Sequence, residues 1–252
     1  MAKIIKLWIV ISILVVTMTQ AELMGYYSFN GNAQDSGGNG NHGTVYGAVL
    51  ANDRHGNANS AYSFDGNNDY INAGSSNGYN DLWNAITISA WVQTPSAPGV
   101  HKGIVSKGTN ASYNNFDFNI EPNGTVRFWF HDVSASSIVY SSTSMGDGEW
   151  HHIVAVWDGT YNCIYVDGVL EDEMPNAPTI VASGAPLLIG SWNTSPGWYW
   201  KGMIDEVSIY NEALSPTTFN FPGSTPVPEP MTLIMFLFVV LFYGFGRGNI
   251  KK

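Results

Sequence analysis

The sequence predicts an all-β fold, a two-sheet antiparallel sandwich or jelly roll. Short runs rich in β-branched and aromatic residues recur along the chain, and clusters of Gly, Asn, Asp, Ser and Pro separate them. No amphipathic helix of useful length lies between these runs. Regularly spaced short strands without intervening helices are typical of antiparallel sandwiches and jelly rolls.

The stretch from Gly148 to Gly168 is the strongest part of this prediction. Trp150 to Trp157 is an apolar run with apolar side chains on both faces, which indicates a strand covered on both sides. Asn162 to Val166 is a second strand candidate, and the Asp167-Gly168 pair after it suits a two-residue hairpin turn. We therefore expect an antiparallel meander in the middle of the sandwich.

The remaining elements follow from the same patterns. The other predicted strands are Leu23 to Phe29, Thr44 to Val49, Ala61 to Phe64, Asp69 to Ile71, Ala85 to Gln93, Gly103 to Lys107, Asn115 to Ile120, Thr125 to Phe130, Leu187 to Ser191 and Gly202 to Tyr210. We expect one helical turn at Asn211 to Leu214 and a solvated loop at the acidic cluster Glu171 to Glu173, because Pro175 follows it. Trp200 is expected to enter the core as the last strand begins.

Residues 1–21 resemble a secretory signal peptide. A basic start precedes a short apolar run from Leu7 to Val16, and small residues lead to Ala21, after which we expect cleavage. The alternative is a buried N-terminal helix. With this segment removed, residues 22–215 form the predicted domain, about the size of a single all-β unit.

Charge and cysteine content narrow the function classes. Between residues 22 and 222, five Lys and Arg stand against nineteen Asp and Glu, a net charge of −14. Such an acidic surface repels phosphate backbones, so we expect no nucleic-acid partner, whereas divalent cations and neutral partners remain suitable. Cys163 is the only cysteine. We expect it to be a small buried hydrophobic residue rather than a catalytic thiol.

Several segments together resemble a known family of jelly rolls. They occur in the family's order at Tyr26 to Phe29, Asp35 to Gly43, Tyr62 to Ile71, Thr87 to Val92, Gly148 to Val154, Ile164 to Gly168, Leu188 to Gly190 and Gly202 to Ser215. This set is similar to LamG-like domains, the laminin-G type 3 members of the concanavalin A-like lectin/glucanase superfamily. The resemblance implies a concanavalin A-like sandwich. It does not specify a function, because the fold carries lectins, adhesion modules and hydrolases alike.

A calcium site is the first site hypothesis. Calcium prefers carboxylate, amide and carbonyl oxygens, and the glycine-rich loop from Asn30 to Gly43 offers Asp35 and Asn41, with Asn30 as a weaker candidate. The resemblance implies a further ligand, because a strand near the C-terminus of superfamily members commonly supplies an Asp to a structural calcium, and Asp205 occupies the matching place. The alternative is that Asp35 and Asn41 cap turns and Asp205 hydrogen-bonds the loop.

Catalysis has little support in the sequence. The superfamily's glucanases carry alternating Glu and Asp on one strand, so that two carboxyl groups flank the scissile bond. Here Asp117 and Glu121 share a strand with Asn119 between them, and no convincing partner follows. His151 and His152 are adjacent on a strand and point to opposite faces, so they cannot chelate one metal. We therefore expect a protein that is not an enzyme.

Glycan binding is the second site hypothesis. Sugar rings stack on exposed aromatic side chains, and the loop around Trp192 and Trp198 is dense in aromatics. Tyr113 and Trp83 lie in polar loops and are further candidates. The alternative is that these aromatics belong to the core, as they commonly do in sandwiches.

The C-terminal tail resembles a sorting signal. Residues 216–230 form a proline-rich linker that ends in Val227, Pro228, Glu229 and Pro230, residues 231–246 form an apolar helix, and residues 247–252 are basic. The segment is similar to the PEP-CTERM signal of Gram-negative-type bacteria. This resemblance implies a sorting protease of the exosortase type, transient membrane contact through the helix, and organisms that make exopolysaccharide. The alternative is an ordinary C-terminal anchor; both place the domain outside the cytoplasm.

Together these features predict an exported, surface- or matrix-associated recognition or adhesion module. Its expected partner is a glycan or another envelope or exopolysaccharide component. Two alternatives remain open, a glycosidase or polysaccharide lyase on the same fold and a structural matrix protein without a ligand.

Overall fold

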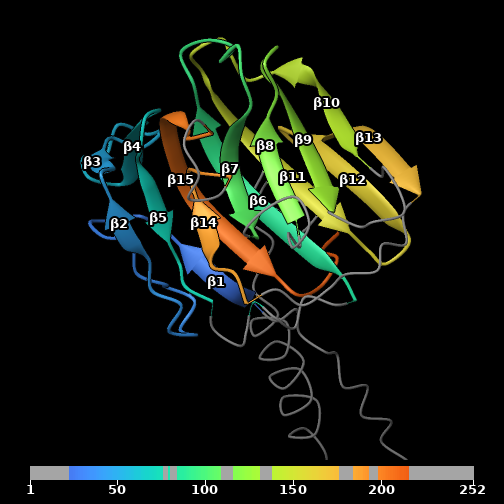
Figure 1. Cartoon of the computed structure of the whole chain (residues 1–252), viewed down its shortest axis with the longest axis horizontal. Coiled ribbons are helices and arrows are strands. Elements are labelled where there is room, and N and C mark those ends of the chain that lie inside the picture. The colour runs from blue at the N-terminus through green and yellow to red at the C-terminus, as the bar shows by residue number, and fades with distance from the viewer. Residues whose placement is uncertain are drawn as a thin grey trace, which may run out of the picture.

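The chain forms two antiparallel β-sheets that lie face to face in this computed structural model (Figure 1). The structure describes residues 23–75, 79, 84–108, 116–130, 138–175, 184–192 and 198–215, and no α-helix occurs among them. Sheet A contains β1 (Leu23–Tyr27), β3 (Val49–Ala51), β4 (Ala61–Asp65), β6 (Ile86–Gln93), β11 (Trp150–Trp157), β12 (Tyr161–Val166), β13 (Val169–Pro175) and β15 (Lys201–Tyr210). Sheet B contains β2 (Thr44–Tyr46), β5 (Tyr70–Asn72), β7 (Lys102–Lys107), β8 (Phe116–Ile120), β9 (Thr125–Phe130), β10 (Val139–Ser144) and β14 (Leu187–Ile189).

The order of the strands is non-sequential. Sheet A runs β13-β12-β11-β6-β15-β4-β3, with β1 also paired to β15, and sheet B runs β10-β9-β8-β7-β14-β5-β2. The predicted meander is confirmed, because β11 pairs with both β6 and β12 in the middle of sheet A. An all-β sandwich with two antiparallel sheets is therefore confirmed for the described part of the chain.

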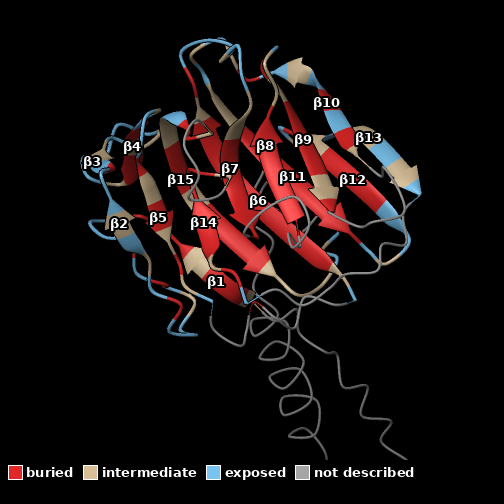
Figure 2. Ribbon diagram, in the orientation of Figure 1, coloured by how far each residue is buried: buried red, intermediate tan, exposed pale blue. Residues whose placement is uncertain are grey.

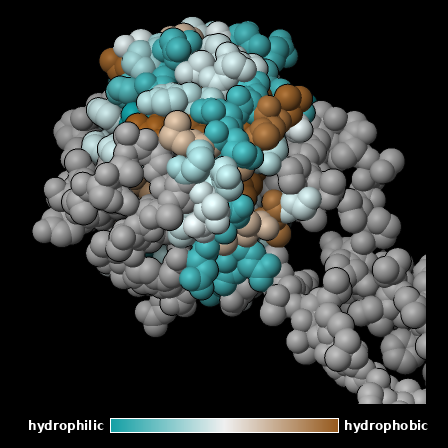
Figure 3. All heavy atoms as spheres, turned by 90° about the vertical axis from the view of Figure 1, so that its right-hand side faces the viewer, coloured by the Kyte–Doolittle hydropathy of each residue, from teal (hydrophilic) through white to brown (hydrophobic). Residues whose placement is uncertain are grey.

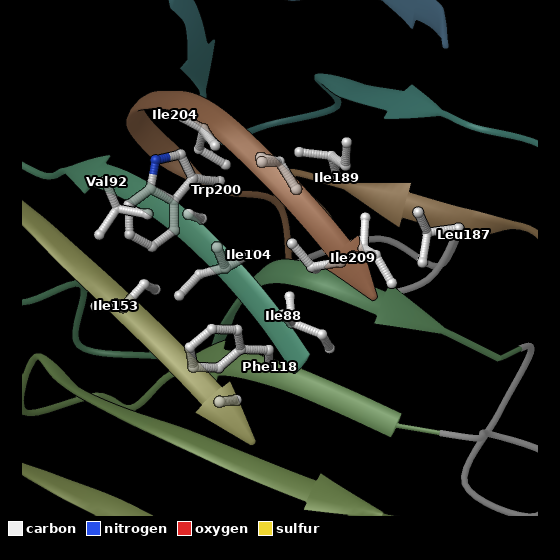
Figure 4. Packing of buried hydrophobic residues seen from close by; sticks show 14 of the residues in the cluster. Ile88, Val92, Ile104, Phe118, Ile153, Leu187, Ile189, Trp200, Ile204 and Ile209 are labelled. Atoms are coloured by element: carbon white, nitrogen blue, oxygen red, sulfur yellow. The ribbon is translucent and has the colours of Figure 1, made fainter. Parts of the chain in front are cut away.

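The main core fills the space between the sheets (Figure 2). Inward side chains from both layers meet there, including Ile88 of β6, Phe118 of β8 and Ile153 of β11 (Figure 4). Trp200 enters this core as predicted, with 1% of its surface exposed. Apolar burial of this kind is the main favourable contribution to folding.

A second, smaller cluster covers the outer face of sheet A. Val154, Val156 and Cys163 are buried there, and Tyr165 and Leu214 pack against them. The prediction that β11 is apolar on both faces is thus confirmed, and Cys163 is a buried free cysteine. The predicted helical turn after β15 is wrong, because residues 211–215 form bends and irregular chain rather than a helix. The backbone of Leu214 donates to Thr87 Oγ1 at 2.9 Å.

Two further predictions about the strands are wrong. The run from Thr44 to Val49 is two strands in different sheets, because the chain turns at Gly47, where φ is +78° and a Cβ would lie 1.9 Å from Asp69 Oδ1. The acidic cluster of Glu171 to Glu173 lies in strand β13, not in a loop. Strand β10 lies opposite β13 across the edge of the sandwich. The sequence pattern does not predict β10 as a strand, because it is rich in serine.

Carboxylates of β13 bind the backbone of β10 and so close one edge of the sandwich. Glu171 Oε2 accepts hydrogen bonds from the N–H groups of Ser142 at 2.7 Å and Thr143 at 2.9 Å, and Asp172 Oδ2 accepts from Tyr140 N at 3.0 Å. Figure 3 shows this side of the molecule, where hydrophilic surface predominates among the described residues and hydrophobic spheres form small separate patches. Unpaired edge strands promote association, and charged side chains protect them.

Several predicted segments lie outside the described residues. They are the signal peptide at residues 1–21, the linker at 216–230 and the apolar helix at 231–246. Within the part of the chain that the structure describes, no helix has the length and apolar character needed to cross a membrane.

Candidate functional site

The outer face of sheet B carries polar and aromatic side chains in its middle strands. Along β8, Phe116, Phe118 and Ile120 enter the core, so Asp117 and Asn119 point outward. The same alternation turns two side chains of the neighbouring strand β9 outward, because its apolar residues alternate with Arg127 and Trp129. In register, Asn119 lies opposite Arg127 and Asp117 lies opposite Trp129.

Trp192, Trp198 and His101 stack against one another beside these strands. The ring centroids of Trp192 and Trp198 are 4.2 Å apart, and those of Trp198 and His101 are 4.9 Å apart. The structure therefore brings the two predicted tryptophans together. Trp198 contacts both of the other rings.

The stack sits directly on β7 because Gly103 has no side chain. A Cβ at Gly103 would lie 2.1 Å from Trp192 N, far inside the contact distance of any real side chain. The Gly103 N–H instead donates to the carbonyl oxygen of Trp198 at 2.9 Å. Ser106 Oγ lies 2.6 Å from the carbonyl oxygen of Trp192. This close backbone approach holds the aromatic segment against the sheet.

Glu121 joins the aromatic stack to the polar strands. Its Oε1 atom lies 3.1 Å from His101 Nδ1 and 3.0 Å from Arg127 Nε. The guanidinium carbon of Arg127 lies 5.6 Å from the ring centroid of Trp129, within the range of a cation–π contact. These contacts fix the orientation of charged and aromatic groups on one surface.

Asn119 is the unusual member of this face. It is completely buried, yet neither its Nδ2 nor its Oδ1 atom has a hydrogen-bond partner among the described residues. Leaving a buried polar group unpaired costs about 1–3 kcal/mol, and such groups in native proteins call for an explanation. The carboxamide offers both a donor and an acceptor, the two functions with which a hydroxyl group hydrogen-bonds.

A family model matches residues 65–218, more than half of the chain, and is described as the concanavalin A-like lectin/glucanases superfamily. The chain belongs to this superfamily. The LamG-like resemblance of the sequence is confirmed at this level. Among curated proteins, none matches the chain.

Solved structures with the superfamily fold include several binding domains. Domain 4 of AbnA, a GH43 extracellular arabinanase from Geobacillus stearothermophilus in complex with arabinotriose, shares 23% identity over 79% of this chain and 96% of that one, with a TM-score of 0.61. The binding domain of Paraclostridial Mosquitocidal Protein 1 shares 16% identity over 78% of this chain, with a TM-score of 0.62. These identities show the fold alone.

A third similar structure comes from a neurotoxin. This neurotoxin is botulinum neurotoxin type C, whose cell entry depends on interaction with two ganglioside molecules. The identity is 14% over 79% of this chain, with a TM-score of 0.60. This chain spans about half the length of the two toxin chains.

Within this superfamily fold, Asp117 and Glu121 lie too far apart to form a hydrolytic pair. Glu121 directly follows the end of β8 and is four residues from Asp117, a backbone separation of about 13 Å for an extended chain at 3.3 Å per residue. A retaining glycosidase needs carboxyl groups about 5–5.5 Å apart and an inverting enzyme about 6.5–9.5 Å. Asn119, an amide, occupies the position between them. The outward residues of β8 therefore suit binding better than bond cleavage.

Three of the four predicted calcium ligands, Asp35, Asn41 and Asp205, have partners within the protein. Both carboxylate oxygens of Asp35 accept backbone N–H groups, with Oδ1 bonded to Tyr26 and Gly37 and Oδ2 to Asn39 and Asn41. This confirms that Asp35 caps the turns of its loop, which was the alternative interpretation. The Asn41 side chain donates to the carbonyl oxygen of Met24 at 2.7 Å.

Asp205 faces a cation instead of the loop. Its Oδ2 atom lies 3.2 Å from Arg54 Nη1, and Asn30 is exposed at the surface. No group of three or more His, Cys, Asp or Glu residues suited to a metal ion occurs in the described ranges. Calcium binding by Asp35, Asn41, Asp205 and Asn30 stays a prediction.

The remaining predicted positions have separate outcomes. Tyr113, Trp83 and the sorting motif Val227 to Pro230 lie outside the described residues. His151 and His152 have different surroundings, as expected for neighbours on a strand: His151 lies between Asp147 and Asp167, whereas His152 Nε2 is 2.7 Å from Ser89 Oγ.

Sequence reasoning missed His101 and Arg127 as members of the candidate site, and it noted Asn119 only as the residue between two carboxylates. His101 and Arg127 are isolated in the sequence, and their connection runs through Glu121 across three strands or loops. The one usable signal was the alternation of polar and apolar residues from Phe116 to Glu121, which predicts a polar outer face on this strand.

Proposed function

We infer that the protein is a carbohydrate-binding, non-enzymatic module and that the outer face of sheet B is its ligand surface. The observation that carries this inference is the aromatic stack of Trp192, Trp198 and His101, which Glu121 joins to Arg127 on the outer face of sheet B. Sugars are recognised by such a combination, because their hydroxyl groups hydrogen-bond to charged and polar side chains and their C–H faces pack on aromatic rings. The arabinotriose complex of a domain with the same fold supports the ligand class.

The spacing of the carboxylates favours binding over hydrolysis. Asp117 and Glu121 are separated by an amide, and Glu121 is engaged by Arg127 and His101. The rival function is that of a glycosidase or polysaccharide lyase. It would require a second acidic group close to one of these two residues, in the range that glycoside hydrolysis needs.

The proposed location is the cell envelope, outer surface or extracellular matrix. The signal-peptide pattern of residues 1–21 and the similarity of Val227 to Pro230 to a PEP-CTERM motif support export and sorting by an exosortase-type protease. Removal of residues 226–252 should change the protein from envelope-associated to released, as measured by cell fractionation. An unchanged distribution would contradict the sorting role.

The binding function is tested with a glycan array followed by isothermal titration calorimetry on the positive glycans. The full chain should bind neutral glycans, and Trp198→Ala should weaken binding at least tenfold while the circular dichroism spectrum stays unchanged. Glu149→Ala is a suitable control, because Glu149 is exposed on the loop before β11. A folded wild-type protein that binds no glycan would favour a structural role, and release of reducing ends would favour the enzyme.

A further inference from the structure

A pocket lies at one end of sheet A, between the end of β6 and the start of β15. Its volume is about 300 Å³. Six residues line this β6–β15 pocket, and none of them is buried: Ser63, Gln93, Pro95, Gly148, Gly202 and Met203. Ligand pockets commonly measure about 300–1,000 Å³, so a pocket at the lower end of this range suits one small group rather than a chain of sugars.

Three neighbouring strands provide the floor of the pocket. Met203 of β15 pairs with Gln93 of β6 on one side and with Ser63 of β4 on the other. The adjacent residues Val92 and Ile204 point into the core (Figure 4), so by alternation the three paired side chains point to the outer face of sheet A. A thioether, an amide and a hydroxyl group therefore lie side by side where solvent reaches them.

Backbone contacts hold the walls of the pocket close to this floor. The Gln93 side chain donates from Nε2 to the carbonyl oxygen of Gly148 at 2.7 Å, and the Gly148 N–H donates to the carbonyl oxygen of Thr94 at 3.1 Å. At Gly202 φ is +136°, and a Cβ would lie 2.0 Å from the carbonyl oxygen of Gln93. Glycine permits this approach because it has no Cβ. The folded backbone thus fixes the shape of the pocket.

The polar groups of the pocket have hydrogen-bonding capacity left for a ligand. The Gln93 nitrogen must face the carbonyl oxygen of Gly148, because a carbonyl oxygen only accepts, and Oε1 therefore points away from it. Among the described residues, Gln93 Oε1 has no donor and the Ser63 hydroxyl has no partner. The pocket consequently offers one acceptor and one hydroxyl group that can donate.

The other contacts that the pocket offers are apolar and uncharged. Met203 and Pro95 supply a thioether and a pyrrolidine ring, and Trp150 pairs with Gln93 on the same face of the sheet. No lining residue carries a charge, although nineteen acidic and five basic residues lie between positions 22 and 222. A charged ligand would lose hydration here without gaining a counter-charge, so the pocket suits a neutral group.

We propose that the β6–β15 pocket binds the acetamido group of an N-acetylhexosamine. The N–H of this group donates to Gln93 Oε1, its carbonyl oxygen accepts from Ser63 Oγ, and its methyl group packs against Met203 and Pro95. A plain hexose has a hydroxyl group in place of the acetamido group, so it leaves the apolar side chains without a contact. The site is separate from the ligand surface inferred on sheet B, because the two share no residue.

Saturation-transfer NMR on the full-length chain, in a detergent without a sugar headgroup, tests the proposal. The probes are N-acetylglucosamine and N-acetylgalactosamine, and the comparison sugars are glucose and galactose, which lack the acetamido group. We expect a dissociation constant of about 1 mM for at least one of the two probes, as suits a ligand of this size. Transfer should be strongest at the methyl protons, and the parent hexose should bind at least tenfold more weakly.

Two substitutions connect this signal to the pocket. Gln93→Leu removes the acceptor and should lower affinity for the acetamido sugar at least tenfold. Ser63→Ala removes one hydrogen bond, leaves the contact between Gln93 and Gly148 intact, and should lower affinity about three- to fivefold. Gln34→Leu is the matched control, because Gln34 is exposed in a loop outside the pocket, and it should bind like the wild-type chain.

The outcomes separate this proposal from the function inferred above. Equal affinity for an acetamido sugar and its parent hexose, unchanged affinity in both pocket variants, or no signal from either acetamido sugar would overturn the acetamido site. None of these results would contradict glycan binding on sheet B, which the array and Trp198→Ala test. Loss of the signal in Trp198→Ala together with its retention in Gln93→Leu would place the sugar on sheet B and overturn the pocket.

Discussion

Arg54 and Asp205 form an ion pair on the outer face of sheet A although 151 residues separate them in the sequence. Arg54 Nη1 lies 3.2 Å from Asp205 Oδ2, and the guanidinium carbon lies 4.4 Å from the ring centroid of Trp91. The Arg54 Nη2 atom also donates to Glu206 Oε2 at 2.9 Å. One side chain from the loop after β3 thus ties the last strand, β15, to β6.

Removal of this arginine should destabilise the fold in a pH-dependent way. Burial, followed by the charge of Glu206, already raises the pKa of Asp205 to about 7. Without Arg54 the ionised form loses its partner, so Arg54→Leu should lower the free energy of unfolding by about 2 kcal/mol at about pH 8, after allowance for partial solvent screening. At about pH 5 Asp205 is protonated and the loss should be smaller. Urea unfolding at both pH values measures this, and equal losses would contradict the assignment.

Asp35 should stabilise its loop without a metal ion. Its carboxylate accepts four backbone N–H groups, from Tyr26, Gly37, Asn39 and Asn41. Asp35→Ala removes both acceptor oxygens and with them all four hydrogen bonds, so it should lower the free energy of unfolding by about 2–3 kcal/mol. If these hydrogen bonds alone hold the loop, a chelator leaves the melting temperature of the wild-type chain unchanged. A fall in melting temperature with chelator, reversed by calcium, would show that an ion is bound.

Glu171 should protect the edge of sheet B. It accepts the backbone N–H groups of Ser142 and Thr143 on the edge strand β10. Glu171→Ala leaves these donors unpaired, so we expect a loss of about 1–2 kcal/mol and a greater tendency to associate. Light scattering during mild heating measures association, with Glu149→Ala as the matched acidic control. Identical scattering from the two variants would remove this role from Glu171.

The sequence contained enough information for the sandwich but not for its edges. Central strands such as β6 and β11 are apolar runs, and this pattern alone predicts them. The edge strand β10 is rich in serine, and the edge strand β13 contains acidic residues. Backbone N–H groups of β10 donate hydrogen bonds to carboxylates of β13, and these contacts stabilise both strands. Such a pairing depends on tertiary proximity, which no local pattern records.

The candidate site was predictable in part for a similar reason. The aromatic density around Trp192 and Trp198 marked the right loop, but only the fold shows that the two rings stack on each other. The position of Asn119 on a polar strand face was visible, whereas its lack of a partner is a property of the packed structure. The association of Asp205 with Arg54 rather than Asp35 likewise depends on which strands become neighbours.

His152 should make the stability of the domain sensitive to mild acid. Burial lowers the pKa of His152 to about 4, and its Nε2 atom lies 2.7 Å from Ser89 Oγ. Above about pH 6.5 the imidazole is neutral in both states, and as the pH falls to about 4 only the unfolded chain takes up the proton. The wild-type chain should therefore lose about 3 kcal/mol over this range relative to His152→Gln. Parallel pH profiles of the two proteins in urea unfolding would contradict this expectation.

Asn119 should be a position at which a polar side chain costs stability. Its side chain is fully buried, and its amide has no hydrogen-bond partner among the described residues. Asn119→Val replaces it with a residue that suits a strand and has no polar atom to satisfy, so the free energy of unfolding should rise by about 1 kcal/mol. Thermal melting and urea unfolding of the two proteins measure this difference. A variant that is less stable than the wild-type chain would show that the amide serves the fold.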